Sequence, residues 1–216
     1  MKRFAYIIFT IIFFIFAFLM TFSYVVFDLD FYESRFEKYS ISKSSNIAND
    51  NLMNITNDLL KYLKDEKSDL NYKHFYSSRE LAHLKDVRAL FQKGFAIRNT
   101  SFFALLILFF YLLKSDRKLI RKGFMLSSIF SLYLIALLFV ISLIDFNKCF
   151  TYFHLIFFNN DLWILDENDI LIQMFPEKFF MSIFIRILLL FVSIMSIILI
   201  TTKSISKCSQ NPEEYK

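Results

Sequence analysis

Four long stretches with few or no charged side chains constrain this chain more than any other feature of its sequence. The first, residues 4–27, holds twenty-four residues without Asp, Glu, Lys or Arg, and the others cover residues 99–113, 123–144 and 179–202. A helix of about 20 apolar residues crosses the hydrocarbon core of a bilayer. The chain is 21% charged overall, and those charges gather between the four stretches. The pattern predicts an all-α integral membrane protein with four transmembrane helices.

The first two stretches each admit a second interpretation. Residues 4–27 resemble a cleaved signal peptide, but the apolar run is longer than the core of such a peptide, and residues 20–27 lack the small-x-small cleavage pattern. We therefore expect a retained helix. Residues 99–113 supply only fifteen uncharged positions, so an amphipathic segment ahead of them has to complete the second span.

Basic residues beside the spans predict the orientation, because Lys and Arg are enriched in cytoplasmic flanks. Ten of them lie before the first span, between the second and third, and after the fourth, whereas residues 145–178 carry two against six acidic residues. Both termini are predicted to be cytoplasmic, with a small, mostly helical extracellular cap. The predicted order is transmembrane helix 1 (1–27), extracellular helical segment (28–98), transmembrane helix 2 (99–113), cytoplasmic loop (114–122), transmembrane helix 3 (123–144), extracellular loop (145–178), transmembrane helix 4 (179–202) and cytoplasmic tail (203–216).

Size, charge and cysteine content exclude several classes of protein. Four spans in 216 residues leave room for one small aqueous cap and no large soluble enzyme domain. The net charge of +5 comes from the membrane flanks, which argues against nucleic-acid binding. Cys149 and Cys208 fall on opposite sides of the predicted membrane, so no disulfide is expected. Only Lys148 neighbours Cys149 as a basic residue, which argues against a nucleophilic thiol.

The first outer segment contains several predicted local structures. Residues 28–39 alternate imperfectly and predict an extended or interfacial segment, and residues 40–45 predict a loop. Apolar residues at helical spacing predict an amphipathic helix over residues 47–63. Ser77 with Glu80 three residues later forms a capping-box pattern, which predicts that a helix starts there and leads toward the second span.

Two histidines of the outer segments are candidates for proton transfer. Glu80, His83 and Asp86 are spaced by three on the predicted helix, so a carboxylate can orient the imidazole. His154 interrupts an otherwise apolar aromatic run in residues 153–158, where desolvation favours the neutral, proton-accepting form. Each alone also fits a structural role, as a helix residue bonded to its neighbours or as an interfacial anchor. Both lie on the predicted outer side and could meet there, whereas His74 lies in a polar run.

Other polar groups and motifs bear on binding or catalysis. Arg186 lies within the fourth span, where a charge is costly unless it is paired. A structural ion pair with Asp145 is slightly favoured over a contact with lipid. Glu80 and His83 with His154 and an Asp could form a metal site, but the spacing is weak evidence, and metal-free acid–base chemistry is preferred. No GxSxG, HExxH, CxxC or glycine-rich phosphate loop occurs, and no cofactor is expected.

Three longer motifs resemble a known family. Residues 77–91 (SSRELAHLKDVRALF), 145–163 (DFNKCFTYFHLIFFNNDLW) and 166–180 (DENDILIQMFPEKFF) are similar to those of the lipoprotein intramolecular transacylases, four-span bacterial membrane proteins. The resemblance implies transfer of the sn-2 acyl chain of an S-diacylglyceryl lipoprotein to the α-amino group of its own N-terminal cysteine. It implies diacylglyceryl lipoproteins and membrane lipid as partners, and a site at the outer leaflet of the bacterial cell membrane.

The resemblance also places the catalytic histidines of the family on His83 and His154. We therefore hypothesise that His154 is the base and that His83 is the proton donor or second relay. Orienting or oxyanion-stabilising roles are expected among the polar residues nearby: Glu80, Asp86, Arg88, Asn159, Asn160, Trp163 and Asp166. A zinc-dependent membrane hydrolase and a non-catalytic four-span scaffold are the alternatives.

Overall fold

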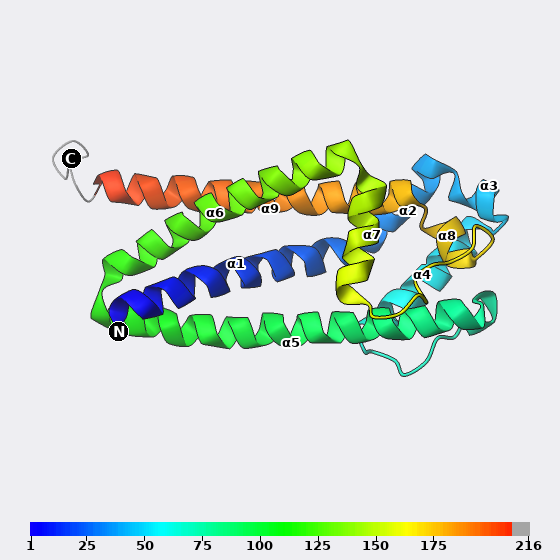
Figure 1. The fold of residues 1–216 in the computed structure, drawn as a ribbon, viewed down its shortest axis with the longest axis horizontal. Helices are drawn as coiled ribbons and strands as arrows, with labels where there is room; N and C mark the ends of the chain where they lie inside the picture. The colour runs from blue at the N-terminus through cyan, green and yellow to red at the C-terminus, as the bar shows by residue number, and fades with distance from the viewer. Residues whose placement is uncertain (209–216) are drawn as a thin grey trace. The chain divides into compact units, whose positions relative to one another are not determined.

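The computed structural model describes residues 1–208, and within them the chain forms nine α-helices, one short 3₁₀ turn and no strand (Figure 1). The predicted all-α architecture is therefore confirmed. The end of the predicted cytoplasmic tail, residues 209–216, lies outside the described part. The helices are α1 (Lys2–Val26), α2 (Leu29–Tyr39), α3 (Ile41–Ser45), α4 (Asn49–Leu63), η1 (Lys73–Phe75), α5 (Ser78–Ser115), α6 (Arg117–Ile144), α7 (Phe146–Phe157), α8 (Ile170–Met174) and α9 (Glu177–Cys208).

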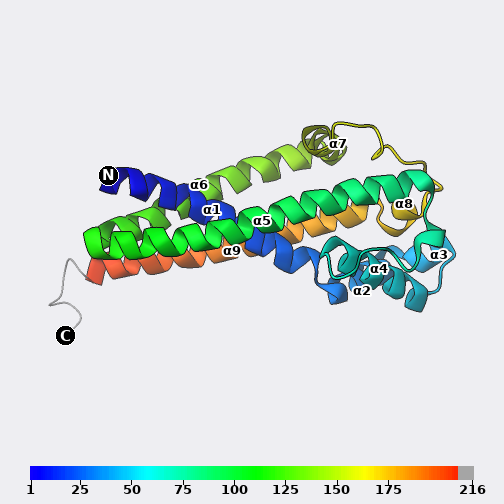
Figure 2. The same cartoon turned by 90° about the horizontal axis from the view of Figure 1, so that it is seen from below.

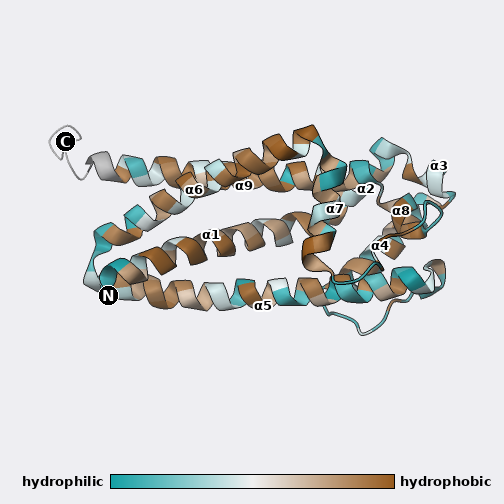
Figure 3. Cartoon of the chain, viewed as in Figure 1, coloured by the Kyte–Doolittle hydropathy of each residue, from teal (hydrophilic) through white to brown (hydrophobic). Residues whose placement is uncertain are grey.

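Four of these helices, α1, α5, α6 and α9, are long and apolar enough to cross a membrane. Hydropathy colouring shows apolar residues along most of α1, α6 and α9, and polar residues in the first turns of α5 (Figure 3). Residues 99–113 belong to one continuous 38-residue helix that begins at Ser78. At 1.5 Å per residue, α5 is about twice as long as a single span requires. Its polar first turns therefore extend beyond the charge-free stretch.

The chain divides into two compact units. The first contains residues 1–22, 96–143 and 186–216, and its core is aromatic. Phe9 and Phe13 pack edge-on against Phe124, with ring centroids 5.1 and 4.7 Å apart. Gly123 allows this close approach of α1 and α6, because a Cβ built there would lie 2.7 Å from the ring of Phe9. Small residues at helix crossings are a common packing solution in membranes.

The second unit contains residues 23–95 and 144–185, and its core lies among α2, α3, α4 and α8. In Figure 2, α2 and α4 run side by side, with α3 close to their ends. Leu52, Ile55 and Leu59 of α4 are buried in this core, which confirms the predicted amphipathic helix. The N–H of Ser77 donates to the Glu80 carboxylate at 2.6 Å, and the N–H of Glu80 donates to the Ser77 hydroxyl at 3.2 Å. The predicted capping box is thus confirmed.

Two predictions for the outer segment were wrong. Residues 28–39 were expected to run extended or along the interface, and the extended form is wrong: residues 29–39 form helix α2, because Tyr32 and Phe36 recur at helical spacing and both pack against Phe175 and Phe179. Residues 40–45, expected to be a loop, contain the short helix α3. Its Ile41 is 2% exposed, and the hydroxyls of Ser44 and Ser45 donate to the carbonyl of Ile41. Residues 163–174 end in the short helix α8.

Candidate active site

His83 lies in the second turn of α5, a position that the capping box fixes by setting where the helix starts. Its side chain is buried, with 8% of its surface exposed. The Nδ1 atom of His83 is buried and has no hydrogen-bond partner among the described residues. A buried imidazole nitrogen without a partner is costly in a purely structural role. The unpartnered nitrogen therefore points to a functional role.

His154 lies on the inner face of α7 in a stripe of residues four apart. Phe146 and Phe150 of this stripe pack against Phe184 and Phe180 of the same unit. The ring of Phe150 also contacts the imidazole of His154, with centroids 4.3 Å apart. The Nδ1 of His154 lies 2.8 Å from the carbonyl of Phe150. Because a carbonyl oxygen only accepts, Nδ1 carries the proton, and Nε2 of the neutral ring is left as the proton acceptor.

The structure brings the two histidines together. Their ring centroids are 6.0 Å apart, and the ring of Phe158 contacts both, at 5.3 Å from His83 and 5.6 Å from His154. Trp163 stacks on His154 with centroids 4.9 Å apart and planes inclined by 27°. The indole Nε1 of Trp163 is also buried without a partner among the described residues. Two of the buried side-chain nitrogens without a partner among the described residues thus belong to residues in contact with His154.

Burial shifts both histidines toward their neutral forms. The pKa of His83 is lowered from 6.5 to about 4, mainly by burial and further by the nearby His154, while Asp86 acts in the opposite direction. The pKa of His154 is also lowered by burial, against the opposing hydrogen bond to Phe150. Both residues precede or lie outside the charge-free stretches that form the spans. At neutral pH both imidazoles are uncharged and able to accept a proton.

Glu80 and Asp86 have different surroundings. The carboxylate of Glu80, 1% exposed, accepts hydrogen bonds from the N–H groups of Ser77 and Leu171, the latter at 2.8 Å, and no hydrogen bond joins it to His83 within residues 1–208. Glu80 therefore ties α8 to the start of α5. The carboxylate of Asp86 accepts from the side-chain amide of Asn160 at 2.8 Å and acts on His83 only through its charge.

Arg79 is a residue of this region that the sequence analysis did not single out. Its Nε donates to the carbonyl of Ile164 at 2.9 Å, and its terminal nitrogen donates to the carbonyl of Asp161. Arg79, His83 and Asp86 lie four and three residues apart, so they share one face of α5. That spacing was visible in the sequence, but nothing there showed which loop the face would meet.

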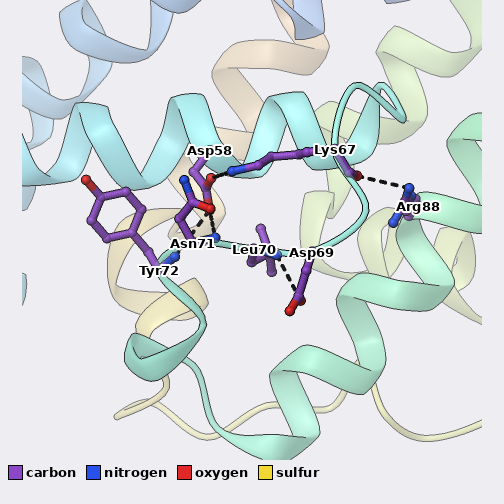
Figure 4. Close-up of polar contacts among 7 residues, drawn as sticks. All are labelled: Asp58, Lys67, Asp69, Leu70, Asn71, Tyr72 and Arg88. Atoms are coloured by element: carbon purple, nitrogen blue, oxygen red, sulfur yellow. Dashed lines mark hydrogen bonds and ion pairs between the residues drawn. The ribbon is translucent and has the colours of Figure 1, made fainter.

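The other predicted site residues lie in varied places. Asn159 and Asp166 are exposed. Arg88 donates to Asp65 and to the carbonyls of Lys67 and Ser68, and its guanidinium lies 4.4 Å from the centroid of the Tyr62 ring. These contacts commit Arg88 to the loop after α4, as Figure 4 shows for Lys67. The predicted role of Arg88 as an oxyanion donor gains no support from this geometry.

The same loop is held from its other side by Asp58, which is 5% exposed. Its carboxylate pairs with Lys67 and accepts from the backbone N–H of Asn71 at 2.8 Å and of Tyr72 at 3.3 Å (Figure 4). A polar cavity of about 190 Å³ borders this node. Since the buried carboxylate is saturated by donors of its own chain, we interpret the node as structural.

Asp145 and Arg186 belong to different units. Asp145 caps α7 by accepting from the N–H of Lys148 at 3.0 Å, and its carboxylate also forms an ion pair with the Lys148 ammonium at 3.0 Å. The ion pair predicted between Asp145 and Arg186 stays a prediction. Residues 1–208 contain no group of three or more His, Cys, Asp and Glu side chains that could hold a metal ion.

Comparison with known proteins gives a consistent family. A family model described as "Lipoprotein intramolecular transacylase Lit" matches residues 7–180. The fold is similar to that of the membrane-integral lipoprotein intramolecular transacylase Lit from Bacillus cereus, with a TM-score of 0.89 and 23% identity over 97% of this chain and 98% of that one. No match is found among curated proteins.

Two further solved structures of the Bacillus cereus protein carry a substitution of one histidine. The variant with arginine in its place matches with a TM-score of 0.83 and 22% identity, over 99% of this chain and 95% of that one. The variant with alanine matches with a TM-score of 0.80 and 23% identity, over 97% and 96% of the two chains. At these identities the structures show that the integral-membrane fold is shared.

Proposed function

Because this chain belongs to the lipoprotein intramolecular transacylase family, whose members are acyltransferases, we propose that it converts diacylglyceryl lipoproteins to the lyso form. The sn-2 acyl chain of the S-diacylglyceryl group moves to the α-amino group of the same N-terminal cysteine. The observation that carries the proposal is the pair of buried, neutral imidazoles of His83 and His154, 6.0 Å apart in an aromatic enclosure.

The reaction is an aminolysis of an ester, and it needs two proton transfers. An α-ammonium group has a pKa of about 7.7 to 8, so a neutral imidazole accepts its proton against an unfavourable pKa difference, which the lowered pKa of His154 widens. His154 is the proposed base, because its Nδ1 faces the Phe150 carbonyl and leaves Nε2 as the acceptor. The amine nitrogen then forms the new bond to the acyl carbon. The nitrogen then carries one proton too many, and as the bond to the glycerol oxygen breaks, the neutral His83 accepts that proton and passes it to the leaving oxygen.

The acyl carbonyl develops negative charge before the ester bond breaks. Among the predicted oxyanion donors, the Nε1–H of Trp163 has the strongest support, because it is buried beside His154 without a partner in the described chain. One well-placed donor contributes about 2.7 to 4 kcal/mol to catalysis. The nucleophile and the ester belong to one substrate molecule, so proximity supplies much of the remaining rate enhancement.

The exposed apolar face of α7 supports a location of the site at the membrane surface. This helix begins two residues after the end of α6, and it exposes large hydrophobic side chains outside the His154 stripe: Tyr152, Phe153, Leu155, Ile156 and Phe157. An apolar helix face of this kind is stable when it lies in the interfacial region of a bilayer. We place the site at the outer leaflet, where the glycerol esters of a lipoprotein lie, with both termini cytoplasmic as the basic flanks predict.

Mass spectrometry of the N-terminal lipopeptide from a reporter lipoprotein tests the proposal. Co-expression with the wild-type chain should convert the diacylglyceryl-cysteine to an N-acyl, S-monoacylglyceryl form, and His83→Ala or His154→Ala should abolish the conversion. His74→Ala is the matched control, because His74 is the remaining histidine and is exposed. If a well-expressed wild-type chain leaves the lipopeptide mass unchanged, the transacylase proposal is wrong.

A further inference from the structure

The segment between α7 and α8, which carries Trp163, has little hydrogen-bonded structure of its own. Within residues 158–165 the described backbone bond is a single turn, in which the N–H of Ile164 donates to the carbonyl of Asp161 at 3.1 Å. The Asn160 side chain accepts from the N–H of Leu162 at 3.0 Å, and the N–H of Phe158 donates to the carbonyl of His154 at 2.8 Å; beyond residue 158, the other polar support comes from α5. The position of the indole therefore depends on a neighbouring helix.

Two residues of α5 hold this segment on either side of Trp163. Arg79 donates to the carbonyls of Asp161 and Ile164, the two ends of the turn that contains the indole. Asp86 accepts from the side chain of Asn160 at 2.8 Å. His83 lies between Arg79 and Asp86 on the same helix face. Helix α5 therefore carries His83 and also holds the segment whose Trp163 stacks on His154.

We propose that Arg79 and Asp86 form a clasp that sets the distance between Trp163 and His154, which makes Arg79 a positioning residue of the site. Arg79 contacts carbonyls of its own chain and acts through Trp163. A guanidinium suits this role, because its planar fork presents several donors in fixed directions and can reach two carbonyls at once. Without the clasp, the indole is free to move off the imidazole, and water reaches His154.

The consequences follow from the geometry of the site. Burial favours the neutral form of His154, and the stacked indole supplies part of that burial. The charged and titratable groups around this part are Arg79, His83 and Asp86 on α5 and Asp161 in the segment itself. Loss of the Arg79 contacts should therefore raise the pKa of His154 toward its ordinary value and expose the indole.

The intrinsic fluorescence of the purified full-length protein tests the clasp, because Trp163 is the single tryptophan of the chain. Arg79→Ala should shift the emission to longer wavelength and increase quenching by acrylamide. Arg79→Lys keeps the charge but loses the fork, so it should change the emission in the same direction. Lys85→Ala, at an exposed position on the same helix that makes no hydrogen bond or ion pair with the segment among the described residues, is the matched control and should leave the emission unchanged.

Activity provides the second measurement, and only this measurement rests on the proposed function. Arg79→Ala should lower kcat by about 10- to 100-fold with little change in KM, because displacement of a catalytic group by about 1 Å has effects of this size. The acid limb of the pH profile should move toward 6.5. Full rescue by Arg79→Lys would indicate a role for charge alone and would overturn the clasp.

The outcomes separate the clasp from the function. If the emission and the quenching of both Arg79 variants match those of Lys85→Ala, the clasp is wrong, whatever the activity of the wild type. If Arg79→Ala does not fold, Arg79→Lys decides by the same measurements. If the wild type lacks transacylase activity while the Arg79 variants expose Trp163, the clasp stands and the proposed function fails.

Discussion

The indole of Trp163 stacks on the imidazole of His154, with ring centroids 4.9 Å apart and planes inclined by 27°. Phe150 also contacts the imidazole, with ring centroids 4.3 Å apart, and its carbonyl faces Nδ1. This arrangement removes water from the ring and fixes which nitrogen carries the proton. A single tryptophan in contact with the proposed base also makes that base observable by fluorescence.

Protonation of His154 should quench the fluorescence of Trp163, because an imidazolium ion in contact with an indole accepts an electron from its excited state. The pKa of His154 is lowered by burial, so the quenching transition should have its midpoint below 6.5. Steady-state fluorescence over a pH titration measures it. His154→Gln should abolish the transition and His74→Gln should leave it in place. A midpoint at or above 6.5 would contradict the buried, neutral imidazole.

Acidification should destabilise the unit that contains His83. Its pKa is about 4 in the folded chain and about 6.5 when the chain is unfolded, so the unfolded state binds more protons between these values. The stability contributed by the neutral ring is therefore complete above pH 6.5 and is lost as the pH falls toward 4, by about 3 kcal/mol. Thermal unfolding in detergent at several pH values measures the loss. His83→Gln should flatten the dependence, and an unchanged slope in that variant would refute this assignment.

Glu80→Gln should lower the stability of the second unit by about 1 to 3 kcal/mol, because the carboxylate accepts from two backbone N–H groups and an amide offers one acceptor oxygen. Melting temperature measures the effect. Glu33→Gln on α2, an exposed glutamate, is the control and should have little effect. Equal melting temperatures for the two variants would show that the link from Glu80 to Leu171 contributes little.

The two glycines of the chain should respond in opposite directions to alanine. A Cβ at Gly94 meets nothing within 4 Å, so Gly94→Ala should stabilise helix α5 by about 0.5 to 1 kcal/mol. A Cβ at Gly123 lies 2.7 Å from the ring of Phe9, so Gly123→Ala has to displace that ring and should destabilise the first unit by about 1 to 3 kcal/mol. Thermal stability of the two variants under the same conditions gives the comparison. Stabilisation by both would mean that the ring of Phe9 moves at little cost.

Part of the site could be predicted because it depends on short-range patterns. The capping box at Ser77 and Glu80 fixes the start of α5 through local hydrogen bonds, and the aromatic run around His154 makes its burial foreseeable. The partner of Glu80 could not be foreseen, because Leu171 lies 91 positions away and its N–H carries no mark in the sequence. For the same reason Arg79 was missed, since its acceptors are backbone carbonyls of a distant segment.

The sequence by itself determined the class of the protein. A charge-free stretch that crosses a bilayer has no water to bond, and a helix satisfies its backbone hydrogen bonds within the stretch itself. It also determined the helix over residues 49–63 and the cap of α5, since both depend on periodicity and local bonds. Only the tertiary structure decided that α2 is a helix, that Glu80 holds α8, and that Trp163 covers His154. These features arise from contacts between segments far apart in the chain, and such contacts exist only once the chain has folded.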